Sequence, residues 1–279
     1  VIENSDETLR KICYDQAHER YGEDLPQIVS ARLEKELNSI IKNGFAAMYI
    51  IAQKLVWKSV EDGYLVGSRG SVGSSLVANL LGITNTNPLD THYFCKNCKY
   101  IEFHTEEDCG VDLPNKICPK CGKELIKDGY TLPEETYTNY DFGKELDISL
   151  NLPPEFICTA HEILRKNANG KIIDYGQIQT MPPEFAYNLV IEYARKRKLK
   201  FHDLREIDYF EKLEKCKSDI QSALGVFILP PEKEITDYTP VEYLSDVNDH
   251  KQKITHFDYR EIYHSFLKID LLYPHNSLS

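Results

Sequence analysis

Two pairs of cysteines constrain the fold of this chain more than any other feature. They follow the pattern C-x2-C…C-x2-C and comprise Cys95, Cys98, Cys118 and Cys121. The 19 residues between the pairs, 99–117, give a separation typical of zinc ribbons, in which each pair supplies two thiolates to one tetrahedral ion. Four sulfur ligands leave no position for water, so we expect a structural zinc in an inserted module at 91–127. The alternative is a set of buried thiols without metal.

The composition indicates a globular protein in a reducing compartment. No apolar run approaches the roughly 20 residues that a bilayer span requires, and the longest is "FAAMYIIA" at 45–52. The first residues, "VIENSDETLRK", are charged and do not form a secretion signal. We therefore expect a cytoplasmic protein with no membrane partner. The first residue is Val, which indicates either processing or a segment of a longer chain.

The remaining four cysteines are interpreted as packing or surface thiols rather than disulfides; they are Cys13, Cys109, Cys158 and Cys216. The net charge of −11 disfavours unaided binding of nucleic acid, because such binding depends on Lys and Arg neutralising phosphates. We interpret the one dense basic run, 194–202, as the exposed end of a helix.

Hydrophobic periodicity predicts an α+β fold. The expected helices are 6–21, 25–43, 45–61, 71–82, 154–167, 183–198 and 204–222. The expected strands are 64–68, which we predict to be buried, and 145–151, 225–230, 255–259 and 266–272. We predict three parts: a helical N-terminal part (1–63), a sheet domain (64–90 and 128–279) and the cysteine module (91–127).

The stretch "GSRGSVGSS" (67–75) lies between a predicted strand and a predicted helix. Glycines allow the backbone to approach a ligand closely, the N-terminus of a helix offers N–H groups to an anion, and Arg69 adds a positive charge. The candidate phosphate-binding residues are Gly67, Ser68, Arg69, Gly70 and Ser71. The alternative is an ordinary turn, for which Gly and Ser are also used.

Two carboxylates lie in predicted strands. In "ELDISLNL" (145–152) Asp147 and Ser149 share one strand face, because residues i and i+2 project to the same side. Asp270 lies in the apolar run "FLKIDLL", where a charge is costly unless it is exposed, paired or bound to metal. The alternative for Asp270 is an outward-facing strand residue. His256 and Asp258 alternate in "THFDY", and we interpret such a histidine as structural.

These motifs together resemble the palm region of the PolC-type DNA polymerase III catalytic subunit. The resemblance rests on "RLEKELNSIIKNGFA", "DGYLVGSRGSVGSSLVA", "HYFCKNCKYIEF", "CPKCG", "TPVEYL" and "LKIDLL". It is nearly colinear over 7–130 and patchier from 141 to 272. It implies a polymerase-beta-like nucleotidyltransferase palm with the four-cysteine zinc module as an insertion. It also implies a glycine-serine turn that binds the incoming triphosphate and three aspartates that hold magnesium.

Carried over by position, the resemblance places Asp147 and Asp270 at two of the three magnesium-binding aspartates and Ser149 at the missing one. Two further family segments differ: a "GQHPGG"-like stretch corresponds to "QSALGV" (221–226), and "YPHNSLS" (273–279) replaces a "GHDDPT"-like stretch. A neutral hydroxyl is a weak ligand for a hard cation. Since phosphoryl transfer depends on electrostatic stabilisation by metals, we expect no polymerisation by this chain alone.

Three functions remain open at this stage. The first is a palm relative without polymerase activity that binds a deoxynucleoside triphosphate, DNA or a replication protein. The second is an active metal-dependent nucleotidyltransferase in which Asp258 or Glu145 supplies the third acid. The third is a zinc-stabilised interaction module. Magnesium and triphosphate titration separates them, because the first predicts binding without turnover, the second turnover and the third neither.

Overall fold

The computed structural model describes residues 4–104, 108–133, 146, 148–180, 191–192, 195–196, 217–230, 232–244, 252–257, 259–262 and 266–272. The chain forms two compact units. The first comprises Val1–Ile172, Phe227–Lys233 and Phe266–Ser279, and the second comprises Ile173–Val226 and Glu234–Ser265. Both helices and sheets are present, which confirms the α+β class. The predicted division into three parts stays a prediction.

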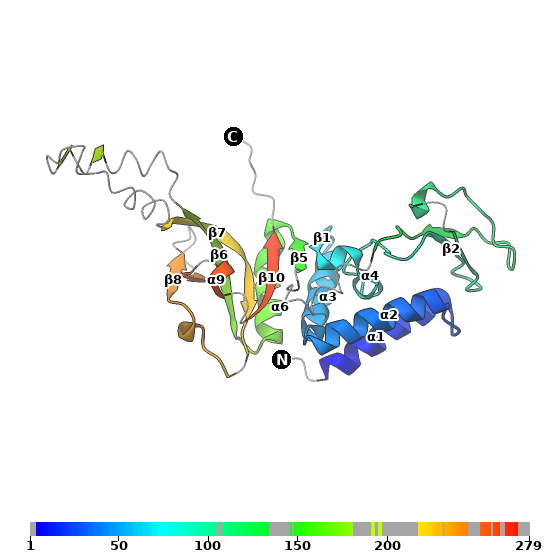
Figure 1. Ribbon diagram of the computed structural model, residues 1–279, viewed down its shortest axis with the longest axis horizontal. Coiled ribbons are helices and arrows are strands. Elements are labelled where there is room, and N and C mark those ends of the chain that lie inside the picture. The colour runs from blue at the N-terminus through cyan, green and yellow to red at the C-terminus, as the bar shows by residue number, and fades with distance from the viewer. Residues whose placement is uncertain are drawn as a thin grey trace. The chain divides into compact units, whose positions relative to one another are not determined.

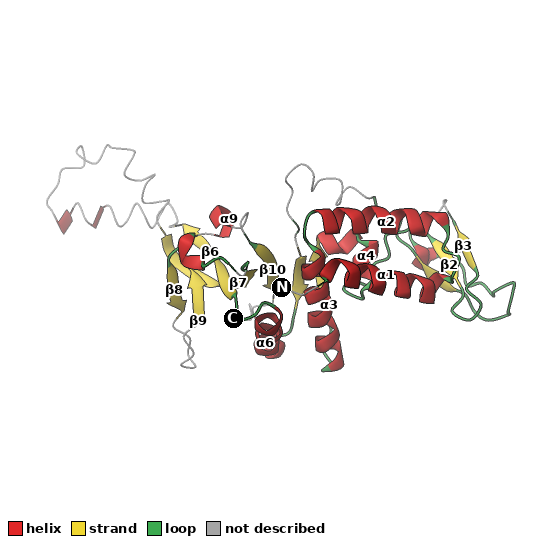
Figure 2. Cartoon of the chain, turned by 90° about the horizontal axis from the view of Figure 1, so that it is seen from below, coloured by secondary structure: helices red, strands yellow, loops and turns green. Residues whose placement is uncertain are grey.

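Three long helices open the first unit: α1 (Ser5–Tyr21), α2 (Gln27–Lys42) and α3 (Ala46–Glu61). All three were predicted. The α2 residues Val29, Leu33, Leu37 and Ile40 recur at helical spacing and are fully buried, and burial of each such side chain contributes about 1.5–3 kcal/mol. Helices α1 and α2 lie side by side (Figures 1 and 2), and α3 packs against α1. None of the described helices is long and apolar enough to span a bilayer.

The predicted helix at 71–82 is only partly correct. The structure has a 3-10 turn at Ser71–Ser74 followed by the short helix α4 (Leu76–Leu80), which packs against α1 and α2. The break falls at Ser75, whose backbone is extended and whose hydroxyl accepts the Ala78 N–H as an N-cap. The sequence pattern is continuous across this break because Val72 and the α4 side chains are all buried.

The sheet of the first unit contains β1 (Gly67–Gly70), β5 (Ile148–Asn151) and β10 (Leu267–Leu272), in the order β1-β5-β10. β1 is antiparallel to β5, and β10 is parallel to it (Figure 1). The strands predicted at 145–151 and 266–272 are confirmed over 148–151 and 267–272, whereas the described residues Leu146 and Phe266 lie outside the strands. The strand predicted at 64–68 begins later and is largely exposed, with Leu65 94% exposed, because β1 pairs with β5 on one side only.

A further helix, α6 (Ile157–Asn167), follows β5 after a 3-10 turn at Pro154–Phe156. It was predicted at 154–167, and it packs against α3. Its buried residues are Ala160 and Leu164, and Phe156 is buried in front of it.

The cysteine module is a small three-stranded antiparallel sheet with β2 (His92–Phe94) between β3 (Ile101–Phe103) and β4 (Ile126–Asp128). A 3-10 turn at Gly110–Asp112 packs against β4. A Cβ on Gly110 would lie 2.2 Å from the Asp128 carbonyl oxygen, so this approach requires glycine. Tyr93, Leu113 and Leu125 form the module core together with the cysteines.

The second unit contains most of β6 (Ile172–Thr180) and β7 (Lys217–Ile228), together with β8 (Val241–Leu244), β9 (Gln252–Thr255) and the short helix α9 (Tyr259–Ile262). The strand order is β7-β6-β9-β8. β6 runs parallel to β9, and β8 runs antiparallel to it. A 3-10 turn occupies Ile235–Asp237.

Several predictions fail in this unit. The helix predicted at 204–222 is wrong over 217–222, which belongs to β7, and 204–216 lies outside the described residues. Strand pairing overrides the local helical pattern there. The strand predicted at 255–259 ends at Thr255 and is followed by a bend and α9. β6 and β8 were not predicted. The strand predicted at 225–230 is the end of β7, and the described residues of the helix predicted at 183–198 are helical.

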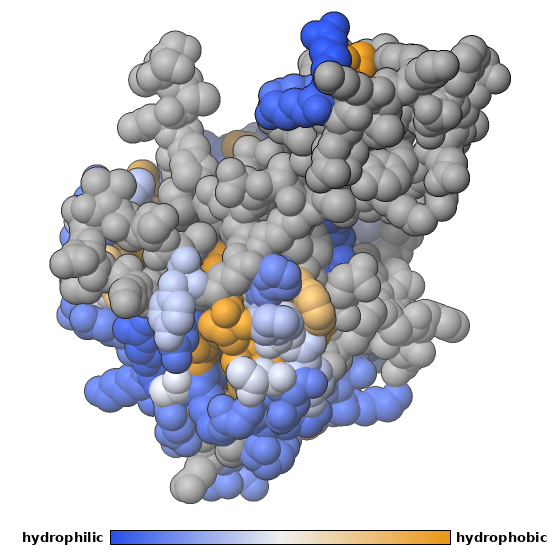
Figure 3. Space-filling view, turned by 90° about the vertical axis from the view of Figure 1, so that its left-hand side faces the viewer, coloured by the Kyte–Doolittle hydropathy of each residue, from blue (hydrophilic) through white to orange (hydrophobic). Residues whose placement is uncertain are grey.

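Figure 3 shows the side of the molecule on which β8 lies in Figure 1. Hydrophilic residues predominate among the described residues of this face, with a small hydrophobic group near its centre. Tyr243 and Phe257 are the large hydrophobic residues of the second unit that the structure describes as exposed. None of the predicted site residues that the structure describes lies in this unit.

Candidate functional site

The sheet β1-β5-β10 has one apolar and one polar face. Directly paired residues of neighbouring strands lie on the same face. The apolar face contains Ile148, Leu150, Ile269 and Leu271, all buried. On the polar face Arg69 pairs with Ser149, which pairs in turn with Asp270. This polar face, with Arg69, Ser149, Asn151, Lys268 and Asp270, is the candidate nucleotide site.

Asp270 is surrounded by donors on this face. The Ser149 hydroxyl donates a hydrogen bond to Asp270 Oδ2 at 3.0 Å. Lys268 Nζ lies 3.2 Å from Oδ1 and 3.3 Å from Oδ2. The side chains of Lys268 and Asp270 are only 15% and 18% exposed, so the ion pair is largely shielded from water. Asp270 is therefore engaged in an ion pair and a hydrogen bond, and it is not the isolated outward-facing strand residue of the alternative interpretation.

The other acids predicted for the site, Asp147, Asp258 and Glu145, lie outside the described residues. His256 is half-buried in the bend after β9 and belongs to the second unit. Of the sequence-predicted acidic site, the described residues bring together Ser149 and Asp270.

The predicted phosphate-binding residues form a strand rather than a turn. Gly67, Ser68, Arg69 and Gly70 make up β1, and Ser71 begins the 3-10 turn after Gly70, which has a φ of 80°. The exposed Arg69 side chain donates to Asn151 Oδ1 at 3.2 Å. A Cβ on Gly67 would lie 3.2 Å from Asn151 Nδ2, which favours glycine there. Arg69 is thus held across the polar face by β5.

A buried carboxylate occupies the N-terminus of α4, which begins five residues after the start of the helix predicted at 71–82. Glu36 of α2, 1% exposed, accepts the Leu76 N–H at 3.1 Å and the Val77 N–H at 3.0 Å. It also accepts the Ser75 hydroxyl at 3.0 Å and Arg32 Nε at 2.6 Å. The helix N-terminus is therefore satisfied by the protein itself. The phosphate position expected from the sequence is the start of the helix predicted at 71–82, where the 3-10 turn at Ser71–Ser74 lies, and it stays a prediction.

Arg32 and Glu36 together fix the segment that follows β1. Arg32, 8% exposed, also donates to the carbonyl oxygen of Ser74 at 2.9 Å and to that of Leu132 at 3.3 Å. Burial raises the pKa of Glu36, and Arg32 and the two α4 N–H groups act in the opposite direction. Sequence reasoning missed this pair, although an Arg and a Glu four residues apart on the apolar side of α2 were the available signal.

The four module cysteines converge. Their Sγ atoms all lie within 4.8 Å of one another, with 3.4 Å between Cys95 and Cys121 and 3.5 Å between Cys98 and Cys118. A tetrahedral zinc with Zn–S bonds of about 2.3 Å places its sulfurs ~3.8 Å apart. The donor set therefore fits one metal ion. The N–H of Lys123 contributes most to lowering the pKa of Cys121 to about 6. The N–H of Tyr100 acts in the same direction on Cys98, but burial and the neighbouring thiols outweigh it and raise the pKa of Cys98 to about 12, so the fit to a metal rests on the sulfur positions.

The two cysteine turns share one backbone pattern. The N–H groups of Cys95 and Cys118 each bond the carbonyl five residues later, on Tyr100 and Lys123. In each turn the carbonyl of the first cysteine accepts the N–H four residues later, from Lys99 and Gly122, both with positive φ. The turns hold their paired thiols together by local hydrogen bonds. Of the other cysteines, Cys13 is buried, Cys109 half-buried and Cys158 exposed, and Cys216 lies outside the described residues.

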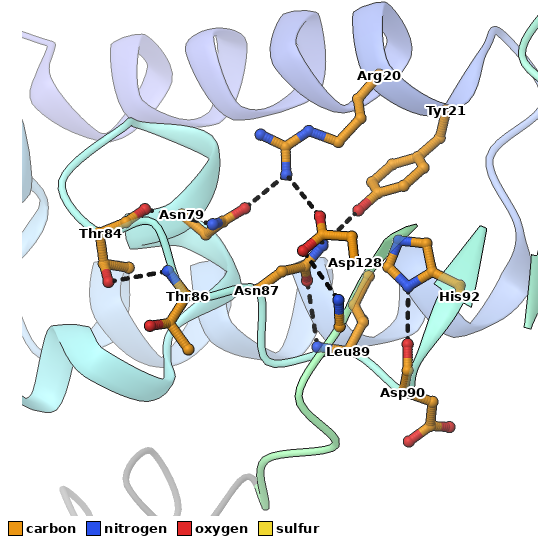
Figure 4. A network of polar contacts seen from close by, with 11 residues as sticks. Arg20, Tyr21, Asn79, Thr84, Thr86, Asn87, Leu89, Asp90, His92 and Asp128 are labelled. Atoms are coloured by element: carbon orange, nitrogen blue, oxygen red, sulfur yellow. Dashed lines mark hydrogen bonds and ion pairs between the residues drawn. The ribbon is translucent and has the colours of Figure 1, made fainter. Parts of the chain in front are cut away.

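A polar network attaches the module to α1 (Figure 4). Arg20 of α1 donates to Asn79 Oδ1 at 2.6 Å and lies 3.9 Å from Asp128 of β4. Asn87 donates to Asp128 at 2.8 Å and to the Tyr21 hydroxyl at 2.9 Å. These contacts join helix, connecting segment and β4, so the module is anchored at its base rather than held by the chain alone. Sequence reasoning gave no signal for this network.

His92 lies beside this network and is fully buried. Its Nδ1 contacts the Asp90 carbonyl oxygen at 2.7 Å, and its ring lies 5.0 Å from that of Phe103. Burial lowers the pKa of His92, which favours the neutral ring with Nδ1 as the donor.

Comparison with known proteins identifies the family of this chain. A family model described as the bacterial DNA polymerase III alpha NTPase domain matches residues 7–167, and the chain belongs to this family. Among individual proteins, it is similar to those named DNA polymerase III PolC-type, which confirms the resemblance seen in the sequence.

Three of these relatives give the scale of the similarity. Identity is 44% over 280 residues with the protein of Caldanaerobacter subterraneus subsp. tengcongensis, covering 98% of this chain and 20% of that protein. Identity is 43% over 281 residues with the Thermotoga maritima protein, covering 98% of this chain and 20% of that protein. Identity is 41% over 278 residues with the Bacillus subtilis protein, covering 97% of this chain and 19% of that protein. The chain thus spans about a fifth of the length of these relatives.

Proposed function

We propose that this chain forms a polymerase-beta-like palm of PolC type that binds the phosphates of a deoxynucleoside triphosphate without polymerising by itself. The observation that carries the proposal is the hydrogen bond from Ser149 to Asp270. By resemblance, residue 149 is where the family has a metal-binding aspartate. Here the side chain at that position donates a hydrogen bond to Asp270 instead of offering a second anionic oxygen.

The argument is electrostatic. Two-metal phosphoryl transfer depends on anionic ligands that hold two cations on the reacting oxygens. The described polar face has one carboxylate, Asp270, and two cations, Arg69 and Lys268. This balance suits an anion better than a pair of magnesium ions, and the described residues do not fit a magnesium pair. Asp147 would add a second carboxylate if the resemblance holds at that position.

Zinc is the metal that we propose for the four-cysteine cluster. Four thiolates with tetrahedral spacing favour a soft or borderline cation, and a closed set of ligands is typical of structural zinc. Such thiolates persist in a reducing compartment, which is the ground for proposing a cytoplasmic protein. DNA and replication proteins remain the proposed macromolecular partners, in accordance with the family.

The test combines binding with turnover. The zinc-loaded protein is titrated with a deoxynucleoside triphosphate and magnesium, and primer extension is measured in parallel. Binding without extension supports the proposal. Extension would instead identify an active nucleotidyltransferase, and absence of both would favour an interaction module.

The substitution Ser149→Asp tests the position directly. If residues 147, 149 and 270 converge, the added charge destabilises the metal-free protein, and magnesium restores stability by binding the folded state. A ligand at 100 times its dissociation constant contributes about 2.7 kcal/mol, so the variant should show a magnesium-dependent rise in Tm that the parent lacks. Ser30→Asp on α2 adds the same charge away from the sheet as a control. No added response to magnesium would show that the three positions do not converge.

A further inference from the structure

Lys268 and Asp270 form an ion pair on the polar face of β10. The two residues are separated by one position on β10, so their side chains project to the same side. Lys268 Nζ lies about equally far from both carboxylate oxygens, at 3.2 Å and 3.3 Å. A single ammonium group thus lies within ion-pair distance of both oxygens of the Asp270 carboxylate.

The Ser149 hydroxyl completes this arrangement. It donates to Oδ2, the same oxygen that Lys268 reaches at 3.3 Å. An aspartate at position 149 would instead repel Asp270 and attract a cation between the two acids. The serine therefore removes the charge that would hold a divalent ion, and the cation in contact with the Asp270 carboxylate is the Lys268 ammonium.

We propose that Lys268 is the built-in counter-cation of Asp270 and that, with the Ser149 hydroxyl, it makes the polar face of β1, β5 and β10 a polyphosphate-binding surface that works without a divalent cation. The anion-binding part of this proposal rests on the function proposed above and specifies the ligand of the same site. Lys268 acts as a positioning residue: it neutralises Asp270, so that the carboxylate does not repel an incoming phosphate.

Arg69 supplies the direct contact in this arrangement. It is exposed on the edge strand, in register with Ser149, and held by Asn151 at 3.2 Å. Asp270 is neutralised within the sheet, so Arg69 offers its charge outward. An anion near the sheet edge then meets one uncompensated positive charge among the described residues of this face. A divalent ion is disfavoured there by two nearby cations.

Two measurements on the zinc-loaded protein test the proposal. Calorimetric titration with inorganic tripolyphosphate, in buffer with and without magnesium, measures anion binding. We expect binding without magnesium and no stronger binding with it, because Mg²⁺ complexes tripolyphosphate and lowers the negative charge that Arg69 attracts. Binding only when magnesium is present would overturn the anion-binding part. Absence of binding in both buffers would overturn that part too, together with the proposed function.

Titration with Mn²⁺, followed by the loss of its free electron paramagnetic resonance signal, tests Lys268 independently. Lys268→Met should raise the affinity for Mn²⁺ about tenfold, because it removes a positive charge ~3 Å from a carboxylate that can bind metal. Lys268→Arg should behave like the parent because it retains the charge. Lys268→Arg also provides a variant at this position for the titration if Lys268→Met does not fold.

Lys54→Met is the matched control. Lys54, on α3, donates to the Asn167 amide oxygen at 2.6 Å, an uncharged partner, so the variant changes the net charge equally without freeing an acid. Equal Mn²⁺ affinity in Lys268→Met, Lys54→Met and the parent would overturn the counter-cation role. A gain in Mn²⁺ affinity confined to Lys268→Met supports the counter-cation role even if tripolyphosphate does not bind. The Mn²⁺ titration therefore tests this role separately from the proposed function.

Discussion

Glu36 connects the helical part of the first unit to the segment that follows β1, and Glu36→Ala should destabilise the fold strongly. Its carboxylate accepts four hydrogen bonds, from Arg32, Ser75 and the N–H groups of Leu76 and Val77. Both members of the ion pair are buried, Arg32 at 8% and Glu36 at 1% exposure. The substitution removes the acceptor and leaves a buried guanidinium without its carboxylate.

The size of the effect follows from these contacts. Removing one partner of a buried ion pair costs about 3–5 kcal/mol, and a buried donor left without an acceptor costs about 1–3 kcal/mol. These costs overlap, because Arg32 keeps the Ser74 and Leu132 carbonyl oxygens and the donors relax together. We expect a loss of about 4 kcal/mol in the free energy of unfolding, a large part of the 5–15 kcal/mol typical of a domain.

Urea denaturation measures this loss through the fluorescence of Trp57, the single tryptophan of the chain. Its Nε1 donates to the Leu81 carbonyl oxygen at 2.9 Å, so it reports on the segment that Glu36 holds. Glu34→Ala on the same helix is the control: Glu34 is 45% exposed and pairs with Arg10 at 3.2 Å. Exposed pairs of this kind contribute about 0–1 kcal/mol.

A double-mutant cycle with Arg32→Met separates the pair from its surroundings. Coupling between contacting residues reaches about 3 kcal/mol, and we expect a value in the upper half of that range. If Glu36→Ala loses no more stability than Glu34→Ala, or if the two substitutions at 32 and 36 are additive, the ion pair does not hold the segment and the reasoning fails.

Three further predictions concern the module and the polar face. The protein should contain one equivalent of zinc by metal analysis, and Cys118→Ser should unfold the module while the helical circular dichroism of α1 to α3 persists; a zinc content of zero would contradict this. Arg69→Ala should weaken tripolyphosphate binding about tenfold with little change in Tm, since the side chain is exposed; equal affinity would place the phosphates elsewhere. Lys116 and Tyr100 lower the pKa of Glu102 from 4.5 to about 2, so its stabilisation is present above pH 4.5 and is lost as the pH falls toward 2. The difference in Tm between the parent and Glu102→Gln should therefore shrink below pH 4.5, and a constant difference would exclude the carboxylate as its cause.

The sequence by itself determined the features that depend on local spacing. The three long helices follow from apolar residues at helical intervals, as at Val29, Leu33 and Leu37. The four-cysteine cluster follows from two C-x2-C turns, because each turn closes its own hydrogen bonds within six residues. The proximity of Ser149 and Asp270 could be inferred only through the resemblance to PolC-type proteins, since the sequence of one strand does not specify which strand pairs with it.

Only the tertiary structure decided the contacts between segments distant in sequence. Glu36 meets α4 across 40 residues, and Ser149 meets Asp270 across 121. Local propensity also failed where pairing or capping overrode it: 217–222 joins β7 instead of a helix, and Ser75 breaks the helix predicted at 71–82. Such contacts depend on which buried polar groups find partners once the chain has folded, because an unpaired group in the interior is costly. That requirement, and not any local pattern, gives Glu36 the helix N-terminus and gives Asp270 the hydroxyl of Ser149.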